Sequence, residues 1–208
     1  MKKALIVYGG WEGHKPKEIA EIQAAQLRQN GFEVTVSDSL DAFKDPNLPN
    51  LDLIVPNWSM GVIQKDQLQP LLKAVEGGVG LGGMHGGMCD SFRNETEYQY
   101  MTGGQWVAHP GNDEATYTVH FDGVPTPITE GFEDFQVTTE QYYMHVDPAN
   151  TVHASSRFGS VVMPAVWTKM WGKGRVFYCS LGHRPDVVTM HPVLTLMTRG
   201  MLWAAERQ

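Results

Sequence analysis

In the first half of the chain, apolar runs of strand length alternate with amphipathic stretches of helical period. Strands are predicted where the apolar positions are continuous or alternate, at 4–8, 32–36, 51–56 and 79–84. Two stretches that end at glycine predict helices, at 16–30 and 64–75. The resulting order β-α-β-β-α-β is typical of a largely parallel sheet with helices on both faces.

The second half carries shorter apolar runs between Gly, Pro and Asp turns, which predict an antiparallel extension of the sheet. Short strands are expected at 106–109, 115–121, 135–143 and 152–154. The runs 163–167 and 175–179 flank a Gly-Lys-Gly turn and predict a hairpin, and the positions 193–206 predict an amphipathic helix. No linker or repeat separates the two halves, so one α/β domain over 1–208 is expected.

The segment 79–88, VGLGGMHGGM, places one histidine between two pairs of glycines. Glycine tolerates positive φ and lets other backbone approach closely. The pattern predicts a buried strand that turns sharply into a helix and presents His85 at the tip, as α/β enzymes present a nucleophile. An imidazole at this position argues against ordinary acyl transfer.

Histidines follow three of the predicted strands: His14 the first, His85 the fourth and His183 the last long one. Ligands of parallel α/β sheets bind beyond the carboxyl ends of the strands, so these rings are expected to meet at one rim. His109 and His145, from the second half, are expected to form the other wall of the site. The nearby carboxylates are Glu12, Glu95, Glu97, Glu140 and Asp147.

Three kinds of chemistry fit these residues. In the first, imidazoles exchange protons with a substrate near neutral pH. In the second, three histidines, or two histidines and a carboxylate, hold a divalent ion. The expected histidines are His85, His109 and His183, although no His-x-His or His-x-x-x-His spacing indicates a local site. In the third, Cys89 is a nucleophile, but we expect it to be a small buried thiol beyond the elbow. No cofactor is assigned, and a dinucleotide is not expected because no Gly-x-Gly-x-x-Gly follows the first strand.

Aromatic residues accompany the same loops. Trp11, Trp106 and Tyr143 are expected to line a cleft, because aromatic faces stack on the C–H faces of sugars. Core packing is the alternative for each aromatic residue, and it is favoured for Trp58 and Trp167.

Composition narrows the class of partner. The formal net charge is −7 and no Lys/Arg cluster exceeds Lys2-Lys3, which argues against nucleic acid and mildly against a phosphorylated substrate. The first apolar run is too short for a signal peptide or membrane span, and two cysteines fit reduced thiols. A cytoplasmic location without a membrane partner is therefore expected, and homo-oligomerisation stays open.

Several stretches together resemble the ThuA-like family, named for trehalose utilisation. They lie at 82–87, 97–98, 103–104, 108–110, 139–143, 145–148, 164–167 and 172–183. The resemblance covers nearly the whole chain, and its last block is the most specific. It implies a flavodoxin-like fold similar to class I glutamine amidotransferases, a three-layer sandwich around a mostly parallel sheet.

In those amidotransferases the elbow carries Cys, paired with a His after a later strand. Here His85 is at the elbow and His183 at the partner position, so glutaminase activity is not expected. The resemblance implies an enzyme of bacterial sugar catabolism that acts on a sugar or keto-sugar; a non-catalytic sugar-binding or regulatory protein is the alternative. The expected catalytic residues are His85, His183, Glu97 and Glu140. The expected substrate-binding residues are His14, Trp11, Trp106, His109, Tyr143 and His145.

Overall fold

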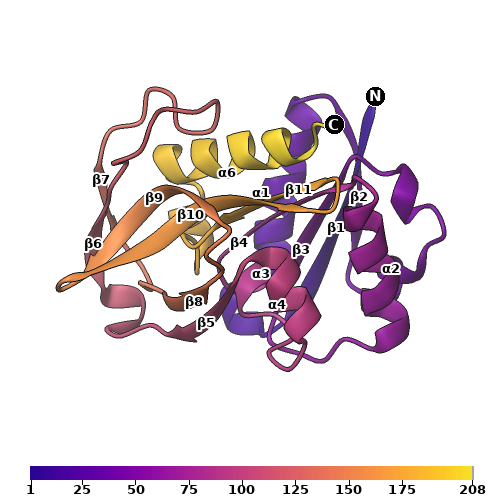
Figure 1. The fold of residues 1–208 in the computed structure, drawn as a ribbon, viewed down its shortest axis with the longest axis horizontal. Helices are drawn as coiled ribbons and strands as arrows, with labels where there is room; N and C mark the ends of the chain where they lie inside the picture. Colours follow the sequence, from indigo (N-terminus) through magenta and orange to yellow (C-terminus); the bar gives the residue numbers. More distant parts are fainter. Residues whose placement is uncertain (208) are drawn as a thin grey trace.

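The computed structural model describes residues 1–207. Its main sheet consists of β1 Lys2–Gly10, β2 Phe32–Ser37, β3 Leu53–Ser59, β4 Gly80–Met84, β9 Thr151–Phe158, β10 Val161–Trp171 and β11 Gly174–Cys179. The strand order is β2-β1-β3-β4-β11-β10-β9 (Figure 1). The first five strands in that order are parallel, β10 is antiparallel to β11, and β9 is antiparallel to β10. The predicted parallel sheet with an antiparallel extension is confirmed.

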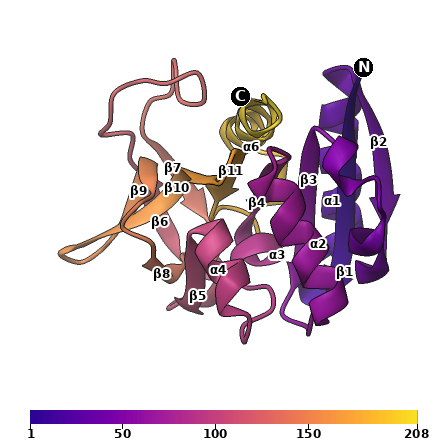
Figure 2. The same ribbon diagram turned by 45° about the vertical axis from the view of Figure 1, so that its right-hand side comes forward.

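Helices cover both faces of the sheet and complete three layers (Figure 2). One face packs against α1 Pro16–Gln29, α5 Pro185–Val188 and α6 His191–Ala204, and the other against α2 Lys65–Glu76, α3 His85–Cys89 and α4 Thr96–Thr102. Each face of the sheet has its own hydrophobic core, and successive side chains of β1 point to opposite faces. Ala4 and Ile6 belong to one core, and Leu5 and Val7 belong to the other. Within residues 1–207, no helix combines the length and apolar character needed to cross a membrane.

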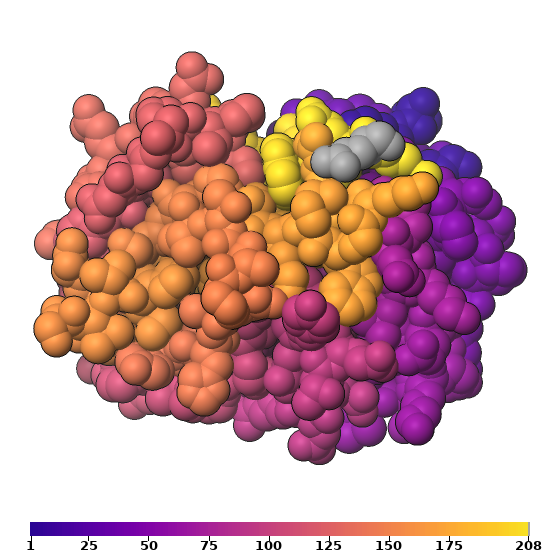
Figure 3. Space-filling view, viewed as in Figure 1, coloured from indigo at the N-terminus to yellow at the C-terminus, as the bar shows by residue number. Residues whose placement is uncertain are grey.

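The extension contains two further two-stranded sheets. These pair β5 Gly104–Ala108 with β8 Tyr143–Val146, and β6 Thr116–Val119 with β7 Phe135–Thr138. Short 3-10 helices lie in the connections: η1 Glu12–His14, η2 Leu40–Lys44, η3 Leu48–Asn50 and η4 Asn112–Glu114. The β9–β10 hairpin, orange in Figure 3, forms much of one side of the molecule.

The single strand predicted at 135–143 is wrong, because the structure divides it into β7 and β8. The residues between these strands leave the ladder, since their side chains bind elsewhere. Thr139 Oγ1 donates to the carbonyl of Gly182 at 2.9 Å, and Gln141 Nε2 donates to the carbonyl of Arg157 at 2.9 Å. Through this gap Glu140 reaches the rim of the main sheet.

Three parallel strands of the main sheet bring their carboxyl ends to the same rim. η1 follows β1, α3 follows β4, and a short loop follows β11. His14, His85 and His183 occupy these three connections. The topology therefore gathers side chains that are far apart in the sequence.

Candidate functional site

The turn from β4 into α3 holds His85 in a left-handed conformation, with φ of 47°. L residues other than glycine rarely adopt this conformation, so neighbouring groups must hold it. The buried hydroxyl of Tyr178 on β11 contributes by donating to the carbonyl of His85 at 3.1 Å. The next residue must be small, because a Cβ on Gly86 would lie 2.4 Å from His14 Cε1. The elbow thus forms as the glycine pattern predicts.

The end of β3 fixes the position of His14. Ser59 contributes two contacts: its Oγ lies 2.6 Å from His14 Nδ1, and its carbonyl accepts from the backbone N–H of Trp11 at 3.2 Å. Asn57 Nδ2 donates to the carbonyl of Pro16 at 2.8 Å and ties the start of α1 to the same strand. These bonds leave Nε2 of His14 directed toward the site.

Glu140 and His183 are set side by side by a bond between their neighbours. The Thr139 hydroxyl donates to the Gly182 carbonyl at 2.9 Å, so the residues that follow each of them are adjacent. His183, like His85, has a positive φ, of 75°. The Tyr117 hydroxyl donates to the backbone carbonyl of Glu140 at 3.3 Å. These hydrogen bonds fix the backbone around Glu140 and so position its carboxylate.

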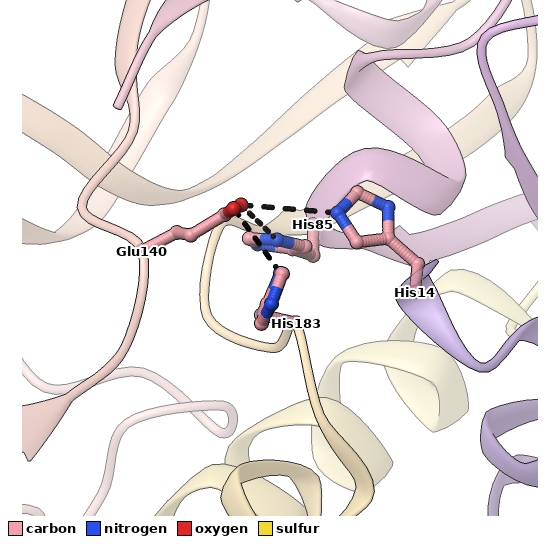
Figure 4. Close-up of side chains that lie close together, drawn as sticks. All are labelled: His14, His85, Glu140 and His183. Carbon is pink, nitrogen blue, oxygen red and sulfur yellow. Dashed lines mark hydrogen bonds and ion pairs between the residues drawn. The ribbon is translucent and has the colours of Figure 1, made fainter. Parts of the chain in front are cut away.

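Three imidazoles surround this carboxylate (Figure 4). Glu140 Oε2 lies 3.1 Å from His85 Nε2 and 3.8 Å from His14 Nε2, and Oε1 lies 3.3 Å from His183 Nδ1. His14, His85 and Glu140 are buried, and the His183 side chain is 12% exposed. One donor atom from each of the four lies within 4.8 Å of all the others.

Hydrogen bonding fixes the tautomer of His85. Its Nδ1 lies 2.8 Å from the carbonyl oxygen of Ser180, and since a carbonyl only accepts, Nδ1 carries the hydrogen. Burial lowers the pKa of His85 to about 4, although Glu140 opposes this shift. Burial alone would raise the pKa of Glu140, but the surrounding imidazoles hold it well below its usual range. A neutral ring therefore directs its Nε2 lone pair at a carboxylate oxygen, an arrangement that a cation between them would stabilise.

This donor set fits a divalent metal ion. Neutral imidazole and carboxylate are common ligands of zinc and neighbouring transition metals. Histidine ligands usually have their second nitrogen hydrogen-bonded to a fixed partner. Ser180 takes this role for His85, and Ser59 for His14. The Nδ1 of His183 is buried without a hydrogen-bond partner among residues 1–207, which leaves its lone pair available to an ion.

The residues that could hold an ion differ from the histidines expected from the sequence. His14 and Glu140 join His85 and His183, whereas His109 stands at the edge of the group. Its Nδ1 lies 3.7 Å from Glu140 Oε1, and its side chain is 30% exposed. It follows the end of β5 in the extension and approaches the carboxylate from outside the main sheet.

Trp11 and Trp106 border the cluster through different neighbours. The Trp11 ring, 44% exposed, lies 4.7 Å from that of His14 between centroids. The Trp106 ring lies 5.4 Å from that of His109, and the Arg93 guanidinium lies 4.5 Å from its centroid. Both positions are compatible with contact to a bound substrate.

The structure does not bring Glu97 to the cluster of His14, His85, Glu140 and His183. The Glu97 carboxylate is exposed on α4 and accepts from Gln69 Nε2 at 3.1 Å. The reason is the orientation of the helix, which buries Tyr98 and Met101 in the core and turns Glu97 to solvent.

Tyr143 and His145 also lie outside the cluster of three histidines and Glu140. The Tyr143 ring packs against Phe158 at 5.4 Å between centroids. His145 is exposed on β8, where Met144 is the buried neighbour. Strand alternation therefore turns His145 outward.

Cys89 lies on α3 with 1% of its surface exposed. Burial raises the pKa of its thiol far above the ordinary value. A nucleophilic cysteine needs access and a lowered pKa, so the structure gives no support to a cysteine-dependent hydrolase.

Two residues of the site were outside the predicted set. Tyr142 stacks on His85, with 4.0 Å between ring centroids and 26° between planes. Ser59 holds His14. Tyr142 lies two residues after Glu140, within the segment 135–143 for which a strand is predicted, and it accompanies the aromatic residues of the site loops in the sequence. Ser59 offers no signal beyond its place at the end of a strand.

The comparisons place this architecture among known proteins. A family model named ThuA and described as trehalose utilisation matches residues 3–204. The comparison with curated proteins gives no match.

Solved structures share the fold. A ThuA-like protein from Parabacteroides merdae has a TM-score of 0.82 at 17% identity, over 98% of this chain and 90% of that one. A Salmonella typhimurium LT2 protein described as cytoplasmic gives 0.71 at 14%, over 98% and 100% of the two chains. A GH42 β-galactosidase from G. stearothermophilus gives 0.61 at 15%, over 94% of this chain but 28% of the enzyme. At these identities the likeness concerns the fold alone.

Proposed function

The chain belongs to the ThuA family, and from this premise we propose that it is a metal-assisted enzyme of carbohydrate catabolism. Its substrate would be a small sugar or glycoside that carries a ketone. The family's link with trehalose utilisation supports a carbohydrate, and the cluster of imidazoles supports proton-transfer chemistry. The Salmonella protein of the same fold, described as cytoplasmic, supports a cytoplasmic location.

One observation carries the proposal: a buried carboxylate faces nitrogens of three histidines, and no Lys or Arg is paired with it in residues 1–207. A cluster of this kind needs a cation or a shared proton, because buried charge is costly without compensation. His85 is protonated on Nδ1, away from the carboxylate, and burial disfavours a second proton on its ring. A divalent ion therefore compensates the buried carboxylate better than a shared proton does.

The residues of this chain divide into two roles. His14, His85, His183 and Glu140 would hold the ion, which acts as a Lewis acid toward a substrate oxygen. His109 would be the base, since its partly exposed ring borders Glu140 and its buried Nδ1 has no hydrogen bond among the described residues. A carbon next to a ketone is acidic enough for imidazole to remove its proton, which leads to isomerisation or to elimination of a glycosidic group.

Exchange of substrate hydrogen with solvent tests this function. Zinc-loaded protein is incubated in deuterated buffer with a ketohexose or with a disaccharide that carries a ring ketone, and deuterium uptake beside the ketone is followed by NMR. Uptake is expected with wild type and with His145→Ala, which alters an exposed histidine outside the site. His85→Ala should lower the rate by about 10²-fold or more. Sugar binding by wild type without exchange would favour the non-catalytic alternative.

A further inference from the structure

Tyr142 is a buried tyrosine whose hydroxyl makes no hydrogen bond within residues 1–207, although the residue is only 3% exposed. Two other tyrosines near the site differ in this respect. The Tyr178 hydroxyl donates to the His85 carbonyl at 3.1 Å, and the Tyr117 hydroxyl donates to the Glu140 carbonyl at 3.3 Å. The Tyr142 hydroxyl is not one of the buried atoms that lack a partner among the described residues, so it keeps contact with solvent and is free to donate to a ligand at the site.

The hydroxyl of Tyr142 lies on the side of the site where His14 meets the elbow. A Cβ placed on Gly86 would lie 3.0 Å from Tyr142 Oη and 2.6 Å from His14 Nδ1, so both groups lie against the same glycine. The Tyr142 ring meanwhile stacks on His85 at 4.0 Å between centroids. The ring is thus held by one member of the cluster while the hydroxyl lies close to another.

We propose that Tyr142 is a further catalytic residue, which donates a hydrogen bond to the substrate oxygen that becomes negatively charged during the reaction. This inference rests on the proposed function. In that step His109 takes a proton from the carbon next to the ketone, and the C–H electron pair forms a C=C bond. The carbonyl π pair moves onto the oxygen, which accepts the hydrogen bond. Tyr142 keeps its proton, so no other reactant is needed.

Tyr142→Phe is the sharpest test, because it removes only the hydroxyl and keeps the ring on His85. The matched control is Tyr143→Phe, whose ring packs against Phe158 at 5.4 Å between centroids. Tyr142→Phe should lower kcat for solvent exchange by about 10²–10³-fold, with KM and zinc affinity nearly unchanged, as for loss of one oxyanion donor. Tyr143→Phe should match wild type.

A second measurement does not depend on turnover. Glycolohydroxamate mimics the charged oxygens of the proposed intermediate, and its Kd for zinc-loaded protein is measured by calorimetry. Tyr142→Phe should raise this Kd by about tenfold, the loss expected for a hydrogen bond to a charged group. Absence of exchange in wild type combined with this Kd change would refute the proposed function while supporting the role of Tyr142. An unchanged Kd, or no binding by wild type, would overturn the role of Tyr142.

Discussion

Replacing Gly86 with alanine tests whether the packing of the elbow sets the position of a metal ligand. The new Cβ would lie 2.4 Å from His14 Cε1 and 2.6 Å from its Nδ1, whereas ordinary contacts lie at 3.4–4 Å. The imidazole must therefore move by about 1 Å in a tightly packed site. That movement would strain its 2.6 Å contact with Ser59 Oγ.

The variant should lose more in metal binding than in stability. Overpacking costs about 1–3 kcal/mol, and alanine regains about 1 kcal/mol because it is a better helix former than glycine. The free energy of unfolding should therefore fall by only about 0–2 kcal/mol. Zinc affinity should fall by about 10–100-fold, because His14 loses its orienting contact.

Two measurements separate these effects. Zinc affinity is measured by competition with a chromophoric chelator, and unfolding by heat in the presence of EDTA. Gly123→Ala is the control, since the nearest atom to a Cβ at that position is 4.0 Å away. Equal zinc affinity in Gly86→Ala, Gly123→Ala and wild type would refute the idea that close packing at the elbow positions His14.

Three other predictions follow from burial and position. In metal-free protein, the free energy of unfolding should fall by about 3 kcal/mol between pH 6.5 and pH 4, because burial lowers the pKa of His85 from 6.5 to about 4 and the unfolded chain takes the proton first. Urea unfolding at several pH values measures this dependence of the free energy of unfolding on pH, which should be weaker in His85→Gln. Glu97→Gln should leave zinc affinity unchanged, whereas Glu140→Gln should weaken it by about tenfold or more; equal effects would contradict the assigned ligands. Since burial raises its thiol pKa, Cys89 should react with iodoacetamide only after unfolding; rapid labelling of folded protein, seen by mass spectrometry, would disprove its core position.

Much of the fold was predictable because the chain repeats simple periods. β1 and α1 show this best: a continuous apolar run and a helical stripe each lie where the sequence places them. The elbow was also predictable, since glycines on both sides of His85 have a physical purpose at a close turn. These patterns involve residues that are close together along the chain, so they can be recognised from the sequence alone.

The site was harder to predict because its members are joined by tertiary contacts. Glu97 and Glu140 are both glutamates close to aromatic residues, and nothing local separates them. Helix orientation turns Glu97 to solvent, while the bond from Thr139 to Gly182 carries Glu140 to the histidines. The segment 139–142 directly follows the strand-like residues 135–138, yet Glu140 and Tyr142 contact the histidines instead of joining a ladder.

Metal analysis tests the central claim, that three imidazoles and Glu140 form a metal centre, most directly. Protein purified without chelators is examined by inductively coupled plasma mass spectrometry, beside His85→Ala and the control His145→Ala. Wild type and the control should each hold on the order of one divalent transition-metal ion per chain, and His85→Ala should hold little. Folded wild-type protein that holds no such ion, and that binds neither zinc nor cobalt when titrated, would contradict the claim.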